Sequence, residues 1–115
     1  MKILVTGGCG FIGSNFINLI LNNNKNIEIV NFDKLTYAGN IKNLNQHKDN
    51  INYSFIKGDI SSEKDLTEII SDESFDFIVN FAAESHVDRS ISNPSDFLKT
   101  NIMGTYMLLN LSNKF

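Results

Sequence analysis

The sequence has one cysteine, no long apolar run and no excess of positive charge, and each shortage excludes a class of protein. The lone cysteine, Cys9, cannot form an intramolecular disulfide, which suits a reducing cytoplasm. No apolar run approaches the roughly 18 residues of a membrane span, and the stretch before Thr6 is too short for the apolar core of a signal peptide. The net charge of −3 gives no electrostatic signature of nucleic-acid binding. We therefore expect a cytoplasmic protein that binds neither membranes nor nucleic acids.

Four strand-like runs alternate with helical patterns along the 115 residues, which contain no internal repeat and no linker. This alternation predicts one α/β domain with a parallel sheet and right-handed crossovers. We expect a Rossmann-type, doubly wound sheet of order 3-2-1-4 in three α/β/α layers, incomplete because a full fold of this type has two further strands. The predicted strands are residues 2–6, 27–32, 53–57 and 77–81. The first predicted helix is residues 11–22, and a short helix capped by Asn40 follows the second strand. The other two are residues 63–71, capped by Ser62, and a last helix that begins at Pro94 and is capped by Asn93.

Three glycines mark the turn between the first strand and the first helix. Residues 3–5 are an apolar, largely β-branched run typical of a buried parallel strand. Gly7, Gly10 and Gly13 follow, and apolar residues then recur at helical spacing. At such a turn, free backbone N–H groups and the helix N-terminus bind the pyrophosphate of a dinucleotide. The glycines permit a tight turn, close approach of the phosphate, and close packing of helix on strand.

A carboxylate follows at the distance that this motif requires. Asp33 ends the second apolar run, twenty residues after Gly13. An acid at this place binds the adenosine ribose hydroxyls. It would also favour NAD over NADP, because a carboxylate about 4 Å from a 2′-phosphate costs about 4 kcal/mol per charge pair at an effective dielectric of 20; Lys34 would offset part of this. The alternatives are a glycine loop with a chance acid, or Asp33 as a loop or capping residue.

Two other patterns resemble catalytic sites, but their spacing argues against both. Tyr53 and Lys57 have the Tyr-x-x-x-Lys spacing of a helical catalytic pair, yet on a strand such residues lie about 13 Å apart. Residues 84–88 combine carboxylates, a serine and a histidine, but neighbours in one short segment rarely aim at a common atom. With two histidines and no metal-binding motif, we expect no metal site.

Some single residues have a structural explanation beside a functional one. Cys9 lies where a helix dipole favours a thiolate, but without a second cysteine we favour a small residue that lets a phosphate approach over a redox role. Thr100, Asn101 and Thr105 are polar positions of an apolar helix, which by themselves indicate a solvated face or bonds to carbonyls one turn back. Gly104 in the same helix indicates a close packing contact.

Four stretches together resemble the N-terminal part of the dTDP-glucose 4,6-dehydratases, a family of extended short-chain dehydrogenases/reductases. They are TGGCGFIGS at 6–14, DKLTYAGN at 33–40, AAESHVDRSI at 82–91 and NPSDFLKTNIMGTYMLL at 93–109. The first is shared by the whole superfamily, whereas the second and third are specific to the dehydratases. The resemblance covers essentially all of the chain, and it makes residues 1–115 the N-terminal portion of an NAD-binding Rossmann domain.

The resemblance implies NAD as the cofactor and assigns residues to it along the chain. The pyrophosphate would contact Gly7, Gly10, Phe11, Ile12 and Gly13. The adenosine ribose would contact Asp33, Lys34, Leu35 and Thr36, and the adenine would be bordered by Asp59 and Ile60. The segment passing along the cofactor would be Phe81, Ala82, Ala83, Glu84 and Ser85, with Thr100 nearby. Ser85 would also reach the sugar nucleotide.

The implied activity is a lyase reaction of nucleotide-sugar metabolism. Bound NAD transiently takes a hydride, and dTDP-glucose becomes dTDP-4-keto-6-deoxyglucose in deoxysugar biosynthesis. The catalytic groups, a Thr-Asp-Glu run and a Tyr-x-x-x-Lys pair, and the substrate-binding lobe are expected beyond Phe115, so the 115-residue chain alone is expected to be inactive. Family members dimerise through helices, which implies a homodimer. The alternatives are another extended short-chain dehydrogenase, such as a UDP-sugar 4-epimerase, and a truncated, non-catalytic NAD-binding module; dTDP and UDP both remain open for the substrate.

Overall fold

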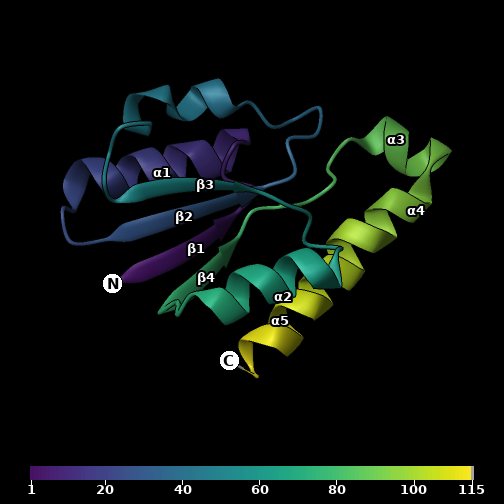
Figure 1. Ribbon diagram of the computed structural model, residues 1–115. Coiled ribbons are helices and arrows are strands. Elements are labelled where there is room, and N and C mark those ends of the chain that lie inside the picture. Colours follow the sequence, from purple (N-terminus) through teal and green to yellow (C-terminus); the bar gives the residue numbers. More distant parts are fainter. Residues whose placement is uncertain (115) are drawn as a thin grey trace.

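A four-stranded parallel sheet lies between two layers of helices in the computed structural model, which describes residues 1–114 (Figure 1). The strands are β1 (Lys2–Thr6), β2 (Glu28–Asp33), β3 (Tyr53–Lys57) and β4 (Phe77–Asn80). Their order, β3-β2-β1-β4, confirms the predicted order. The central strand β1 pairs on both sides, so that Leu4 lies opposite Val30 on β2 and opposite Ile78 on β4.

Helices cover both faces of this sheet. On one face lie α1 (Phe11–Asn23) and η1 (Ile41–His47), a 3₁₀-helix. On the other face lie α2 (Glu63–Asp72) and α5 (Thr105–Ser112), which pack against each other (Figure 1). None of the helices within residues 1–114 has the length and apolar character needed to cross a membrane.

Successive residues of the central strands enter two different cores. Leu4 packs with Val30 and Leu66 on the α2 and α5 face. Val5 packs with Ile17 of α1 on the opposite face. All five side chains are fully buried. Because helices cover both faces, the strands have continuous apolar runs and not the alternation of a half-exposed sheet.

Two of the three predicted helix caps are present. The Ser62 hydroxyl accepts a hydrogen bond from the N–H of Asp65 and donates one to its carboxylate, at 3.3 and 2.8 Å. The Asn40 side chain accepts from the N–H of Lys42 at 3.0 Å. Asn93 stands at the predicted position directly before Pro94, but its side chain bonds those of Ser95 and Asp96 and caps no backbone N–H.

The second half of the chain departs most from the predicted elements. Helix α3 (Val87–Ser92) lies in a segment to which no element was assigned. The single helix predicted from Pro94 is divided into three consecutive elements: α4 (Pro94–Phe97), the π-helical η2 (Leu98–Gly104) and α5. The close contact predicted for Gly104 is confirmed: a Cβ there would lie 2.7 Å from Cδ1 of Ile60.

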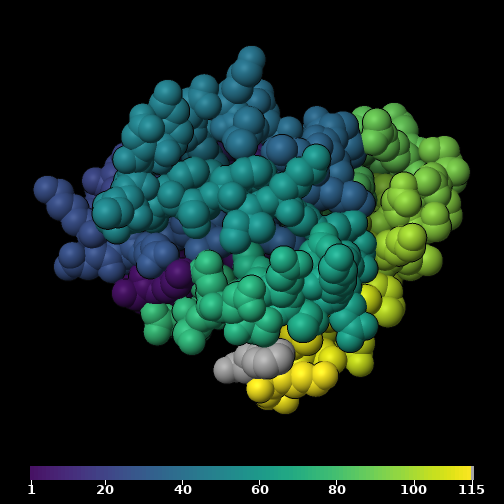
Figure 2. Space-filling model, viewed as in Figure 1, coloured from purple at the N-terminus to yellow at the C-terminus, as the bar shows by residue number. Residues whose placement is uncertain are grey.

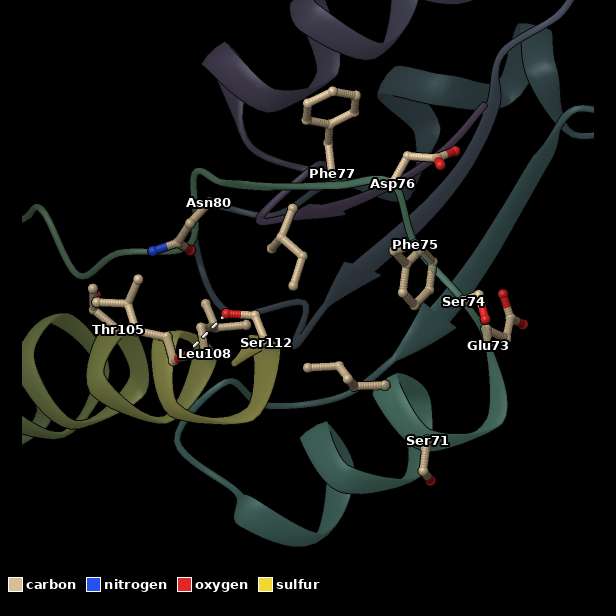
Figure 3. A pocket seen from close by; sticks show the side chains of 13 residues that line it. Ser71, Glu73, Ser74, Phe75, Asp76, Phe77, Asn80, Thr105, Leu108 and Ser112 are labelled. Atoms are coloured by element: carbon tan, nitrogen blue, oxygen red, sulfur yellow. Dashed lines mark hydrogen bonds between the residues drawn. The ribbon is translucent and has the colours of Figure 1, made fainter. Parts of the chain in front are cut away.

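Strand β4 pairs with β1 and with no other strand among residues 1–114, so its outer edge borders a groove. The groove has a volume of about 550 Å³ and runs between β4, the end of α2 and the inner side of α5 (Figure 3). Its apolar lining residues include Phe77, Ile78 and Leu108; the Phe77 side chain points away from α5 in Figure 3 and is 58% exposed.

Candidate functional site

A second hollow, of about 370 Å³, lies at the carboxyl ends of the strands. Segments that follow all four strands contribute to it, together with one residue of η2. Of the residues predicted to bind a cofactor, every one except Leu35 lines this cavity. The lining residues that the sequence did not single out are Phe32, Ala38, Gly39 and Gly58. Gly58 had a recognisable signal, because it directly follows a strand; a Cβ on it would collide with the Phe32 ring.

The glycine turn forms the cavity wall next to β1. Gly7 has a φ of 68°, and a Cβ there would lie 2.5 Å from the backbone nitrogen of Ala82. A Cβ on Gly13 would lie 2.3 Å from the carbonyl oxygen of Gly7, so α1 can pack against the turn only with glycine at this position. The first turn of α1 has no side-chain cap on Gly10 and no acidic residue. Its N-terminal partial positive charge is therefore free to face an anion in the cavity.

Asp33 stands at the end of β2, with its side chain buried beside the glycine turn. Its Oδ2 accepts a hydrogen bond from the N–H of Cys9 at 2.8 Å, and its Oδ1 accepts one from the N–H of Leu35 at 2.8 Å. The carboxylate thus ties the turn to β2 and orients the loop that follows. A carboxylate oxygen has more than one acceptor position, so these bonds leave Asp33 able to bind hydroxyl groups in the cavity.

An ion pair links the ends of β2 and β3 across the cavity rim. The Lys34 ammonium lies 2.6 Å from Oδ2 of Asp59, and this hydrogen bond raises the pKa of Lys34. Burial raises the pKa of Asp59, but Lys34 and the two hydrogen bonds from Ser61 outweigh it, and the net pKa lies below the usual value. The positive charge of Lys34 is therefore directed at Asp59.

The wall after β4 is held by a residue whose role the sequence did not reveal. The Asn101 amide accepts a hydrogen bond from the N–H of Glu84 at 2.8 Å and donates one to its carbonyl at 2.9 Å. Asn101 lies in the π-helical η2, next to Thr100, which lines the cavity. Thr105 bonds the carbonyl of Asn101 through its hydroxyl at 2.8 Å, as the back-bonding interpretation predicts. In the sequence, the only sign of the Asn101–Glu84 hydrogen bonds was a polar residue next to Thr100.

The patterns judged non-catalytic have structural roles. Tyr53 and Lys57 are on strand β3, as predicted, and the Tyr53 hydroxyl accepts a hydrogen bond from Asn31 at 3.0 Å. Cys9 is fully buried, and burial raises the pKa of its thiol to about 11, which disfavours a redox role. Among residues 1–114, no group of three or more His, Cys, Asp and Glu side chains could hold a metal ion.

A family model described as GDP-mannose 4,6 dehydratase matches residues 4–115. The chain belongs to this family. A dTDP-glucose 4,6-dehydratase of Escherichia coli is 49% identical over 115 residues, a match that covers 100% of this chain and 32% of the relative. The resemblance expected from the four sequence stretches is therefore confirmed. The chain spans about a third of the length of the curated relatives that it matches.

Solved structures of dehydratases share the fold closely. A dTDP-glucose 4,6-dehydratase from Bacillus anthracis in complex with NAD is 46% identical, with a TM-score of 0.85 over 99% of this chain and 34% of that protein. The enzyme from Streptomyces venezuelae, also with NAD bound, is 42% identical, with a TM-score of 0.90 over 99% and 36%. A UDP-glucose 4-epimerase from Thermotoga maritima is 34% identical, with a TM-score of 0.86 over 99% and 34%. The same fold thus occurs in relatives named for two different reactions.

Proposed function

We propose that this chain is the cofactor-binding part of a sugar-nucleotide 4,6-dehydratase and that its 370 Å³ cavity binds NAD. The observation that carries the proposal is the meeting of an uncapped helix N-terminus and a buried carboxylate at the carboxyl ends of a parallel sheet. Ligands bind at this place in doubly wound folds. Residues 1–115 are accordingly proposed as the N-terminal portion of an NAD-binding Rossmann domain.

The residues present fit a dinucleotide. Gly7 and Gly13 leave a cradle that a Cβ would fill, and the first turn of α1 offers backbone N–H groups to a pyrophosphate. Phe11 and Ile12 are 83% and 67% exposed, which suits residues whose backbone faces a bound group. The wall therefore combines donors with the space that a diphosphate needs.

The adenosine end would lie between β2 and β3. Asp33 would accept hydrogen bonds from the ribose hydroxyls, with Thr36 and the backbone of Leu35 on the same loop. Asp59 and Ile60 would border the adenine. The carboxylate would also exclude a 2′-phosphate, and the pairing of Lys34 with Asp59 leaves less positive charge to offset that repulsion.

The nicotinamide end would follow the segment after β4. Phe81, Ala82, Ala83, Glu84 and Ser85 line this side, and Thr100 of η2 lines the cavity as well. The Asn101 bonds to Glu84 keep this segment in place. When bound, NAD supplies the acceptor of the hydride that a 4,6-dehydration requires. Ser85, at the end of the segment, is proposed to reach the nucleotide sugar as well.

The reaction of the whole protein is proposed as the conversion of dTDP-glucose to dTDP-4-keto-6-deoxyglucose, a lyase reaction in the cytoplasm. No catalytic residue is assigned within this chain, and the chain by itself is proposed to be inactive. The similarity to UDP-glucose 4-epimerase keeps epimerisation as the second candidate, although DKLTYAGN and SHVDRSI favour the dehydratase. A homodimer is supported by exposed apolar side chains along one side of the last helix, at Leu98, Ile102, Tyr106 and Leu109.

Calorimetric titration of the purified protein with NAD and with NADP tests the cofactor proposal. We expect NAD to bind and NADP to bind at least 10-fold more weakly, because the repulsion of one charge pair exceeds 1.4 kcal/mol. Equal binding of both would contradict the role given to Asp33, and binding of neither would remove the basis of the proposed activity. Because this chain alone is proposed to be inactive, the whole protein is incubated with dTDP-glucose and with UDP-glucose, and product analysis then separates dehydration from epimerisation.

A further inference from the structure

Three side chains join the two walls of the cavity from outside it. The guanidinium carbon of Arg89 lies 4.1 Å from the centre of the Tyr37 ring, which is the geometry of a cation–π contact. The ring of His86 meets the same tyrosine edge-on, with ring centres 6.0 Å apart and planes at 77°. Tyr37 belongs to the loop after β2, whereas His86 and Arg89 belong to the segment after β4. In Figure 2 the blue loop after β2 meets the green α3 segment at this place.

The residues next to Tyr37 and His86 in the sequence show where this stack of three side chains lies relative to the cavity. Thr36 and Ala38, on either side of Tyr37, line the cavity, and so does Ser85, which precedes His86. Tyr37, His86 and Arg89 do not line it. The stack therefore lies at the rim, where it connects two walls that the sheet itself keeps apart, because β1 separates β2 from β4.

The two sides of the stack differ in how firmly they are anchored. The Tyr37 loop is held by the Asp33 carboxylate, by a turn bond from Gly39 to Thr36 at 3.0 Å, and by a bond from the N–H of Asn40 to the carbonyl of Cys9 at 2.9 Å. Helix α3 has no buried residue. The stack on Tyr37 thus joins an exposed helix to an anchored loop.

We infer that Tyr37, Arg89 and His86 form a strap across the mouth of the cavity that slows the release of the bound dinucleotide. The inference rests on the proposed function, since it concerns the same cavity. The three side chains are positioning residues: they hold the Thr36 and Ser85 walls together and need not touch the ligand. Opening the mouth requires Arg89 to leave the tyrosine face, which adds to the barrier for release.

The dissociation rate of NAD in stopped-flow displacement tests the strap. Arg89→Met keeps most of the side-chain length and removes the cation; we expect the rate to rise about threefold to fivefold, the factor that corresponds to an exposed cation–π contact. Tyr37→Leu should raise it similarly, whereas Tyr37→Phe, which keeps the ring, should leave it within about twofold of wild type. The Tyr37→Leu/Arg89→Met double variant should release NAD no faster than the faster single variant, because both changes break one contact.

Controls separate the strap from a general loss of stability. Lys64→Met removes an exposed cation on α2 and should leave release unchanged. The melting temperature of Arg89→Met should fall by no more than about 8 °C, the shift that corresponds to the loss of one exposed contact. Hydrogen exchange without NAD should show faster exchange of residues 34–40 and 87–92 in Arg89→Met. Unchanged release together with unchanged exchange would overturn the strap. Failure of wild type to bind NAD would overturn the proposed function and the retention role, while the exchange comparison would still decide whether the contact ties the two segments.

Discussion

The two hollows of the molecule differ in what lines them, and the smaller one is the proposed cofactor site. The groove beside β4, about 550 Å³, lies between the open edge of that strand, α2 and α5, and mixes apolar residues such as Ile78 and Leu108 with polar ones such as Asn80 (Figure 3). The cavity at the carboxyl ends, about 370 Å³, combines a helix N-terminus, the Asp33 carboxylate and the Lys34–Asp59 ion pair. The site proposed for the cofactor is therefore distinguished by its backbone donors and its charged groups, and not by its volume.

The difference follows from the direction of the strands. In a parallel sheet every strand ends at the same edge, so the turns that begin the helices gather there with their backbone donors. The groove has another origin: β4 has a partner on one side only among the described residues, and residues of α2 and α5 line the space beside its free edge. One hollow results from the convergence of strand ends and helix N-termini, and the other from an unpaired edge.

The largest expected effect is at the glycine turn. Gly7→Ala should lower NAD affinity on the order of 100-fold, because the positive φ costs about 1–2 kcal/mol and the added Cβ would meet the Ala82 backbone at 2.5 Å. Calorimetry measures the affinity, and thermal melting measures the loss of stability. Gly10→Ala is the matched control for stability, since its Cβ would have an ordinary contact of 3.4 Å. Ser74→Ala, in the groove, should leave binding unchanged; an effect there equal to that of Gly7→Ala would end the distinction between the two hollows.

A smaller effect is expected from removing the charge of Asp33. In Asp33→Asn, NAD affinity should fall about 10-fold to 100-fold, since hydrogen bonds to a charged group contribute about 1.5–3 kcal/mol. The preference for NAD over NADP should shrink, because the repulsion of a 2′-phosphate disappears. Titration of both cofactors gives the ratio. An unchanged ratio would mean that Asp33 acts only through its bonds to Cys9 and Leu35.

The wall after β4 should respond more weakly. Asn101→Ala removes both hydrogen bonds to Glu84 and should lower the free energy of unfolding by about 1–3 kcal/mol, with a several-fold loss of NAD affinity. Chemical denaturation and titration measure the two quantities. Thr105→Ser keeps the hydroxyl that bonds the Asn101 carbonyl and should behave as wild type. If Asn101→Ala binds NAD normally, the segment at Glu84 does not depend on this contact.

The smallest expected effect is a loss of stability in acid at a residue outside both hollows. His47 is buried between η1 and the sheet, its Nε2 2.9 Å from Oδ1 of Asn18, and burial lowers its pKa from 6.5. Below pH 6.5 the unfolded chain binds a proton that the folded state resists. The free energy of unfolding should therefore fall as pH drops from 6.5 through the lower folded pKa. Denaturation midpoints across this range should decline less in His47→Gln; an equal decline would exclude His47 as the cause.

The glycine turn and Asp33 were predictable from local signals, whereas the other predicted cavity residues came from the family resemblance. Gly7, Gly10 and Gly13 stand at fixed spacing after a strand, and Asp33 ends the next strand. Both signals depend on backbone conformation and on strand ends, which local apolar patterns indicate well. Asn93 failed as a cap because its neighbours Ser95 and Asp96 compete for its amide.

The sequence alone determined where the strands lie along the chain, the glycine turn and the acid that ends the second strand, because each depends on residues close together in the chain. Only the tertiary structure decided that Lys34 pairs with Asp59, that Asn101 holds Glu84 and that Arg89 stacks on Tyr37. These contacts join segments that are distant in sequence, and their geometry exists only once the sheet and its crossovers have brought the strand ends to one edge.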